Sequence, residues 1–153
     1  MTGGLVRRCQ AERDTVALGE RIGARLQRGD LLSLSGPLGA GKTVLVRGMA
    51  VGVGADPRAV RSPTFVLHQV YQGRALRLHH IDLYRLGSGA DTAFLDIDGL
   101  LEDGAVAVEW GELGRLDRFR PARISVEPED GDARAIALES GSPPRLAEAW
   151  GAA

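Results

Sequence analysis

The segment with the clearest chemical meaning spans residues 36–43 and reads Gly-Pro-Leu-Gly-Ala-Gly-Lys-Thr. Glycines at this spacing let successive backbone N–H groups curl around a polyphosphate, and a helix that follows adds the positive end of its dipole. In this pattern the lysine reaches the β- and γ-phosphates, and the threonine hydroxyl binds Mg²⁺. We therefore expect a purine nucleoside triphosphate to bind at Gly36, Leu38, Gly39, Ala40, Gly41, Lys42 and Thr43.

The flanks of this phosphate-binding loop (P-loop) support the same interpretation. Residues 30–35 are apolar enough to predict a buried strand, and residues 44–50 predict the first turns of a helix. That strand–loop–helix order is the context which the motif requires. Lys42 is also the only lysine of the chain, whose 18 other basic residues are all arginine. A lysine kept against that bias indicates a position where a compact ammonium works and a planar guanidinium does not.

Two acidic residues follow apolar segments downstream and could complete a metal site. Asp82 ends the segment 76–82, and Glu109 ends the segment 105–109. A P-loop enzyme needs an acid at the end of a neighbouring strand, to hold Mg²⁺ directly or through its waters. We assign Asp82 to Mg²⁺ and Glu109 to orienting or activating the attacking water, and the two roles are exchangeable. The candidate metal ligands are therefore Thr43, Asp82 and Glu109, and the candidate catalytic residues are Lys42, Asp82 and Glu109.

Thr64 and Trp110 are the remaining candidates. Thr64 belongs to the Ser-Pro-Thr-Phe segment 62–65, which we expect to be extended because the residue before a proline avoids the helical region. Its hydroxyl either senses the γ-phosphate through Mg²⁺, as switch segments do, or merely belongs to a turn. Trp110 follows Glu109 directly, and it is either a core residue or a flat face for the nucleotide base.

The adjacent histidines His79 and His80 do not predict a zinc site. Neighbouring side chains on a strand point to opposite faces of the sheet, so the two cannot bind one metal. The remaining histidine, His68, does not have the spacing of a third ligand. We expect one of the pair to lie in the core and the other at the surface.

The elements that must position these residues follow from the apolar periodicity. We predict a short strand over residues 5–8, a helix over 11–28, hairpins of 66–71 with 76–82 and of 123–127 with 134–138, a short helix over 91–101, a buried strand over 105–109, and a helix or loose tail over 143–150. The expected fold class is α/β, a P-loop NTPase-like three-layer sandwich with a mixed central sheet. We expect one domain over residues 1–153, with its core at about 12–139 and a terminal helix or tail at 140–153.

Composition excludes several classes of protein. With 19 basic and 20 acidic residues, the chain is not expected to grip nucleic acid through its own basic surface. Its longest uncharged stretches fall short of the roughly 18 apolar residues of a membrane helix, and its N-terminus has no apolar signal core. The single cysteine, Cys9, fits a reducing compartment. We expect a cytoplasmic protein with no membrane attachment.

Four segments occur in one characteristic order: residues 36–43, the SPTF segment 62–65, the HIDLYRL segment 80–86 and the VEWGE segment 108–112. Together they resemble the TsaE (YjeE) family, the bacterial P-loop ATPases of tRNA threonylcarbamoyladenosine biosynthesis. The likeness runs from about Thr15 to about Glu127, which is most of the chain.

The resemblance implies a protein that binds ATP and Mg²⁺ and acts with a partner complex. The partners would be the threonylcarbamoyl transferase TsaD and its paired subunit TsaB. These move a threonylcarbamoyl group from its adenylate to the adenosine beside the anticodon, in tRNAs that read codons beginning with A. Hydrolysis of ATP would reset or regulate that complex, and tRNA would be reached through the complex.

Carried over position by position, the resemblance assigns roles to the candidates above. Lys42 and Thr43 would hold phosphate and metal, Thr64 would belong to the switch, and Asp82 would be the Walker B acid. Glu109 and Trp110 fall where the family has a functional acid and a nucleotide-contacting aromatic residue.

The chain departs from the family pattern at two places. Pro37 stands where the family usually has an acidic residue, which predicts slower hydrolysis if that carboxylate assists turnover. Residues 90–96 replace an acidic segment of the type EELExxG, so a partner contact placed there does not carry over.

Two other functions compete with a partner-dependent ATPase. A small-molecule kinase needs a substrate pocket and usually an arginine-bearing lid, but residues 83–108 leave little room for one and carry only Arg85. A non-hydrolysing ATP-binding switch differs only in turnover, and Pro37 favours it. No arginine finger is evident near the site, so we expect slow turnover by the isolated protein.

Overall fold

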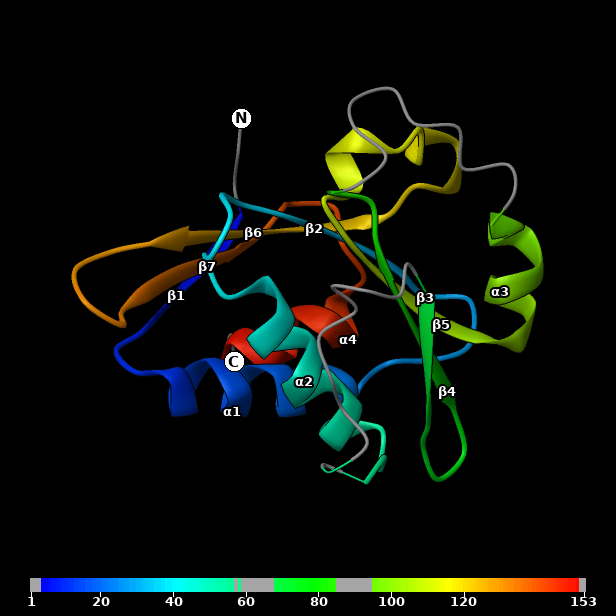
Figure 1. Cartoon of the computed structure of the whole chain (residues 1–153), viewed down its shortest axis with the longest axis horizontal. Coiled ribbons are helices and arrows are strands. Elements are labelled where there is room, and N and C mark those ends of the chain that lie inside the picture. Colours follow the sequence, from blue (N-terminus) through cyan, green and yellow to red (C-terminus); the bar gives the residue numbers. More distant parts are fainter. Residues whose placement is uncertain (1–3, 57, 59–67, 85–94, 152–153) are drawn as a thin grey trace.

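The computed structural model describes residues 4–56, 58, 68–84 and 95–151. Within these ranges, seven strands form one sheet in the order β1-β7-β6-β2-β5-β4-β3 (Figure 1). The strands are β1 Leu5–Cys9, β2 Leu31–Ser35, β3 His68–Gln72, β4 Arg77–Asp82, β5 Gly104–Glu109, β6 Ala122–Pro128 and β7 Arg134–Leu138. The helices are α1 Glu12–Gly23, α2 Lys42–Gly52, α3 Ile97–Asp103 and α4 Pro144–Ala147, with 3₁₀ turns at Gly111–Leu113, Asp117–Phe119 and Glu148–Trp150.

The sheet is parallel at its centre and antiparallel at its margins. Strand β2 runs parallel to β5 and β6, and β5 runs parallel to β4. The two hairpins, β3–β4 and β6–β7, add the antiparallel pairs, and β1 pairs with β7 at the edge. The predicted mixed sheet and both predicted hairpins are confirmed. The carboxyl ends of the parallel strands β2, β4 and β5 therefore meet at one edge of the sheet, which is where ligands usually bind in open α/β sheets.

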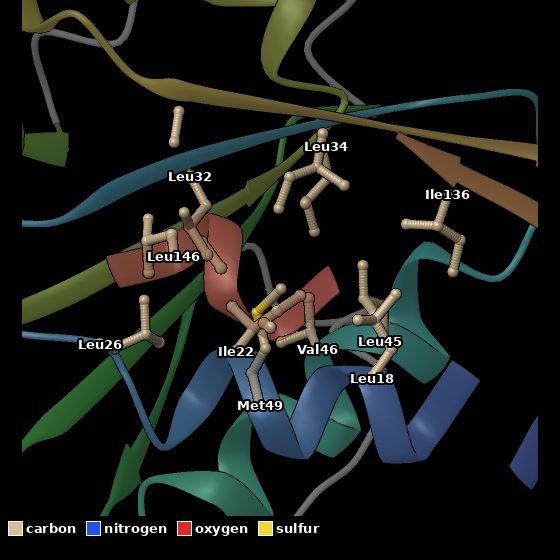
Figure 2. Close-up of a cluster of buried hydrophobic side chains, with 14 of the residues drawn as sticks. Leu18, Ile22, Leu26, Leu32, Leu34, Leu45, Val46, Met49, Ile136 and Leu146 are labelled. Atoms are coloured by element: carbon tan, nitrogen blue, oxygen red, sulfur yellow. The ribbon is translucent and has the colours of Figure 1, made fainter. Parts of the chain in front are cut away.

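Helices cover both faces of the central strands, which gives three layers. On β5, Ala105 and Ala107 belong to the core cluster beneath α1, α2 and α4, whereas Val106 and Val108 belong to a second cluster beneath α3 and the first two 3₁₀ turns. Figure 2 shows the first cluster, in which leucines of the strands meet aliphatic side chains of the helices. The labelled members are Leu18, Ile22, Leu26, Leu32, Leu34, Leu45, Val46, Met49, Ile136 and Leu146. The residues of β5 thus alternate between the two clusters, which is the period of two expected of a strand that is buried on both faces.

Helix α2 is held very close to α1 by glycines on both helices. A Cβ atom on Gly48 would lie 2.2 Å from the carbonyl oxygen of Val16, and one on Gly19 would lie 2.3 Å from the carbonyl oxygen of Leu45. The helix backbones therefore touch, and any side chain at these positions would push them apart. This contact fixes α2, and with it the end of the P-loop, against the sheet.

The C-terminal segment is tied to the strand that leads into the P-loop. Arg145 of α4 donates two hydrogen bonds to the carboxylate of Asp30, at 2.6 and 2.5 Å, directly before β2. The indole N–H of Trp150 donates to the carbonyl oxygen of Ile136 on β7 at 2.9 Å.

Among the described residues, no helix has the length and apolar character needed to cross a membrane.

Candidate nucleotide-binding site

The P-loop connects the end of β2 to the start of α2 and depends on left-handed glycines. Gly36, Gly39 and Gly41 have φ values of +142°, +79° and +110°, which side-chain-bearing residues rarely adopt. At Gly36 a Cβ atom would also lie 2.2 Å from the carbonyl oxygen of Val126 on β6. The first N–H groups of α2, which begins at Lys42, have no partners within the helix. The loop and the helix start therefore form a cradle suited to phosphate oxygens.

The Lys42 ammonium is folded into this loop. The side chain is buried, and Nζ donates to the carbonyl oxygens of Gly36 and Pro37 at 2.5 and 3.0 Å. It also lies 4.2 Å from the centroid of the Trp110 ring, within cation–π distance. Burial lowers the pKa of Lys42 below its ordinary value, and the nearby Glu109 carboxylate opposes that shift. The ammonium thus donates to neutral carbonyl oxygens, which negatively charged phosphate oxygens could replace.

The Thr43 hydroxyl and the Glu109 carboxylate meet at the start of α2. Thr43 Oγ1 lies 2.9 Å from both Oε1 and Oε2 of Glu109, which ends β5 beside β2 and is 3% exposed. A hydroxyl and a carboxylate are the hard oxygen donors that Mg²⁺ prefers. Among the described residues, no three His, Cys, Asp or Glu side chains gather as a metal site. The donor set fits Mg²⁺, which usually keeps several waters and binds through one or two protein oxygens plus substrate phosphates.

Asp82 lies on the neighbouring strand, and its carboxylate forms no hydrogen bond with Thr43. It pairs in register with Glu109 across β4 and β5, and one of its carboxylate oxygens accepts a 2.9 Å hydrogen bond from the Tyr84 N–H. Burial raises the pKa of Asp82, and the negative charge of Glu109 adds to that rise. The structure therefore brings both predicted acids to the carboxyl edge, with Glu109 in contact with the P-loop threonine.

Trp110 lines the site instead of lying wholly in the core. Its backbone is left-handed, with φ +59°, a conformation that strains a residue of this size. One part of the side chain packs on the cluster beneath α3, while the ring meets Lys42 and lies 5.0 Å from the Tyr84 ring. The predicted switch residue, Thr64, and Arg85 lie outside the described residues.

One contact to the loop was missed by sequence reasoning, which did not single out Arg134. Arg134, the first residue of β7, donates from Nε to the carbonyl oxygen of Ala40 at 2.5 Å. Its Nη1 donates to the carbonyl oxygens of Gly131 and Ala133, at 3.2 and 2.8 Å, within the β6–β7 turn. The hairpin predicted over residues 123–127 and 134–138 could have indicated this contact. Its first strand, β6, runs parallel to β2, so β7 begins at the edge of the sheet where the P-loop lies.

The two adjacent histidines are both buried, so the expectation that one lies at the surface is wrong. His79 is 4% exposed and His80 is 1% exposed, because β4 is an interior strand covered on both faces. His79 contacts His68 and Asp103, with Nε2 2.7 Å from the Asp103 carboxylate. His80 faces the other way, and its Nε2 lies 2.5 Å from Oε2 of Glu109.

Comparison with known proteins gives a consistent result. Residues 9–136 match the family described as threonylcarbamoyl adenosine biosynthesis protein TsaE. Two relatives are each named tRNA threonylcarbamoyladenosine biosynthesis protein TsaE. The one from Mycobacterium leprae is 45% identical over 112 residues, which cover 67% of this chain and 69% of the relative. The one from Streptomyces coelicolor is 46% identical over 110 residues, which cover 70% of this chain and 73% of the relative. The crystal structure of Bacillus subtilis YdiB matches with a TM-score of 0.75 at 27% identity, covering 99% of this chain and 96% of that one. The chain therefore belongs to the TsaE family of threonylcarbamoyl adenosine biosynthesis proteins.

Proposed function

We propose that this protein binds Mg²⁺ and ATP at the P-loop and hydrolyses the ATP slowly, in the service of tRNA threonylcarbamoyladenosine formation. The observation that carries the proposal is the contact of Thr43 with Glu109 at 2.9 Å, next to the buried Lys42 and at the start of α2. A phosphate cradle, a cation and a pair of oxygen donors for a metal are the parts that phosphoryl transfer from a nucleotide needs.

Thr43 and Glu109 would hold the metal in this proposal, which exchanges the roles first given to the two acids. The exchange is supported by the register, because Glu109 ends the strand beside β2 whereas Asp82 lies one strand further away. When bound, Mg²⁺ neutralises the charge that develops on the transferring phosphate group. Asp82, whose pKa burial raises, would accept a hydrogen bond from the attacking water and orient it.

The remaining site residues would bind and orient the nucleotide. Lys42 would give up its hydrogen bonds to the carbonyl oxygens of Gly36 and Pro37 and bind phosphate oxygens in their place. The Trp110 ring would stay in contact with the ammonium. Arg134 holds the Ala40 carbonyl and so steadies the loop from outside the cradle. Because that guanidinium is engaged with the loop and the hairpin turn, it does not supply the charge of an arginine finger, which agrees with slow turnover alone.

We assign the partner-dependent role to the TsaD–TsaB threonylcarbamoyl transferase complex, with tRNA reached through that complex. The proposal rests on membership of the TsaE family, together with two large apolar side chains exposed around the site. Leu38 at the tip of the P-loop is 72% exposed, and Tyr84 beside Trp110 is 49% exposed. In this proposal the partner would cover these two side chains. The near-neutral charge of the chain also fits a protein that does not grip tRNA itself.

Phosphate release from Mg²⁺–ATP tests this function, measured first with the protein alone and then with the purified TsaD–TsaB complex. We expect a slow basal rate that rises when the complex is added. Glu109→Gln should abolish most of the release and raise the Mg²⁺ concentration needed for nucleotide binding. Glu102→Gln is the matched control, since Glu102 is an exposed acid on α3 at the opposite end of β5.

Two outcomes would contradict the proposal. Nucleotide binding without phosphate release, with or without the complex, would favour the non-hydrolysing switch and direct attention to Pro37. Unchanged release from the Glu109→Gln variant would show that Glu109 does not belong to the catalytic site.

A further inference from the structure

His80 lies directly behind the acid that contacts the P-loop threonine. Strand β4 presents His80 and Asp82 on the same face, and the pairing of β4 with β5 brings this face beside Glu109. The His80 Nε2 atom lies 2.5 Å from Oε2 of Glu109, and both residues are at least 97% buried. A carboxylate taken out of water this completely needs a hydrogen-bond donor, and His80 provides one.

The contact continues away from the site as a chain of polar side chains. The Tyr71 hydroxyl on β3 lies 3.2 Å from Nδ1 of His80 and donates to Oε1 of Gln69 at 2.6 Å. Both ring nitrogens of His80 therefore lie within hydrogen-bond distance of a polar side-chain atom, which restricts the orientation of the imidazole within a packed interior. A fixed imidazole in turn fixes the carboxylate that it contacts.

This arrangement decides which oxygen of Glu109 is available to a ligand. Both Oε1 and Oε2 lie 2.9 Å from the Thr43 hydroxyl, but only Oε2 is bonded to His80. With Oε2 held by His80, Oε1 and the Thr43 hydroxyl would remain available to a cation. We infer that His80 is a positioning residue, which acts through Glu109 to set the affinity of the site for Mg²⁺. The inference rests on the proposed Mg²⁺–ATP site and adds His80 to the residues that shape it.

The size of the effect follows from how metal sites generally behave. Loss of a partner that orients a metal-binding side chain typically costs about 10–100-fold in metal affinity. Two conservative substitutions separate the halves of the ring. The amide of His80→Gln reaches the position of Nε2 and can still donate to Glu109. The shorter His80→Asn reaches only the position of Nδ1, toward Tyr71.

The experiment measures the Mg²⁺ concentration at half-maximal binding of a fluorescent ATP analogue to the full chain. We expect His80→Asn to raise this concentration about 10–100-fold and His80→Gln to stay close to the wild-type protein. His79→Asn is the matched control, because His79 is the adjacent buried histidine of β4 but bonds to Asp103 on the opposite face. It should leave the Mg²⁺ requirement unchanged.

A second measurement needs no metal. Thermal unfolding of the apo protein with His80→Asn, Glu109→Gln and both together should give changes in Tm that do not add, since the two side chains form one contact. Additive changes would overturn the pairing. If the wild-type protein binds the analogue equally well without Mg²⁺, the proposed metal site is refuted. If binding by the wild type depends on Mg²⁺ but His80→Asn needs the same Mg²⁺ concentration, only the role of His80 is overturned. An equal shift in His79→Asn would also overturn it, because the effect would then belong to β4 as a whole.

Discussion

Replacing Arg134 with alanine should weaken binding of Mg²⁺–ATP about tenfold while leaving the protein folded. The guanidinium spans two segments that are far apart in the sequence. Its Nε donates to Ala40 in the P-loop, and its Nη1 donates to Gly131 and Ala133 in the β6–β7 turn. Without this clamp, the loop must lose more conformational freedom when it closes around phosphate.

The magnitude follows from the contact with Ala40. A hydrogen bond from a charged donor contributes about 1.5–3 kcal/mol, and the half-buried position of Arg134 points to the lower end of that range. About 1.4 kcal/mol corresponds to a tenfold change in a dissociation constant. Arg134→Lys should fall between the wild type and Arg134→Ala, since an ammonium cannot reproduce the several fixed donors of the guanidinium.

Fluorescence titration with an ATP analogue in excess Mg²⁺ measures this effect directly. Arg8→Ala is the matched control on the neighbouring strand β1, where an exposed arginine lies 3.8 Å from Glu129. Surface pairs of this kind contribute about 0–1 kcal/mol, so its affinity should not change. If Arg134→Ala binds the analogue within twofold of the wild type, the contact with Ala40 does not organise the loop, and the reasoning is refuted.

Two further predictions concern stability. Gly48→Ala places a Cβ atom 2.2 Å from the Val16 carbonyl oxygen. Overpacking against backbone falls at or above the upper end of about 1–3 kcal/mol, and the better helix propensity of alanine returns only about 1 kcal/mol. The net loss of about 1–2 kcal/mol should lower Tm by roughly 2–8 °C. An unchanged Tm would mean that α1 and α2 can separate without cost. For His68, burial lowers the folded-state pKa below its usual value of 6.5, and the neighbouring His79 and His80 act in the same direction. The unfolded chain then binds a proton first as the pH falls, so this contribution to stability is complete above pH 6.5 and is lost below it. Tm should therefore decline from pH 7.5 to 5.5 more steeply in the wild type than in His68→Gln, and equal slopes would contradict the argument.

The local signals of the sequence were sufficient to predict most of the fold. The P-loop could be identified because its glycines, its lysine and its threonine are contiguous, and each answers to a local constraint of backbone conformation or ligand chemistry. The strands and hairpins followed from short alternating or continuous apolar runs and from the turn residues between them, which are signals from near neighbours along the chain. Ala105 and Val106 belong to one such continuous run, and they lie in different core clusters because the strand is buried on both faces.

The partners of the site residues were decided by tertiary structure. Sequence reasoning left Asp82 and Glu109 exchangeable, because nothing local says that β5, and not β4, lies beside β2. Thr43 and Glu109 are 66 residues apart, and Ala40 and Arg134 are 94 residues apart, so each contact depends on how the sheet is ordered. The burial of both His79 and His80 likewise required knowing that β4 is an interior strand. A side chain's type and spacing reveal what chemistry it can perform, but the packing of distant segments determines which groups it meets.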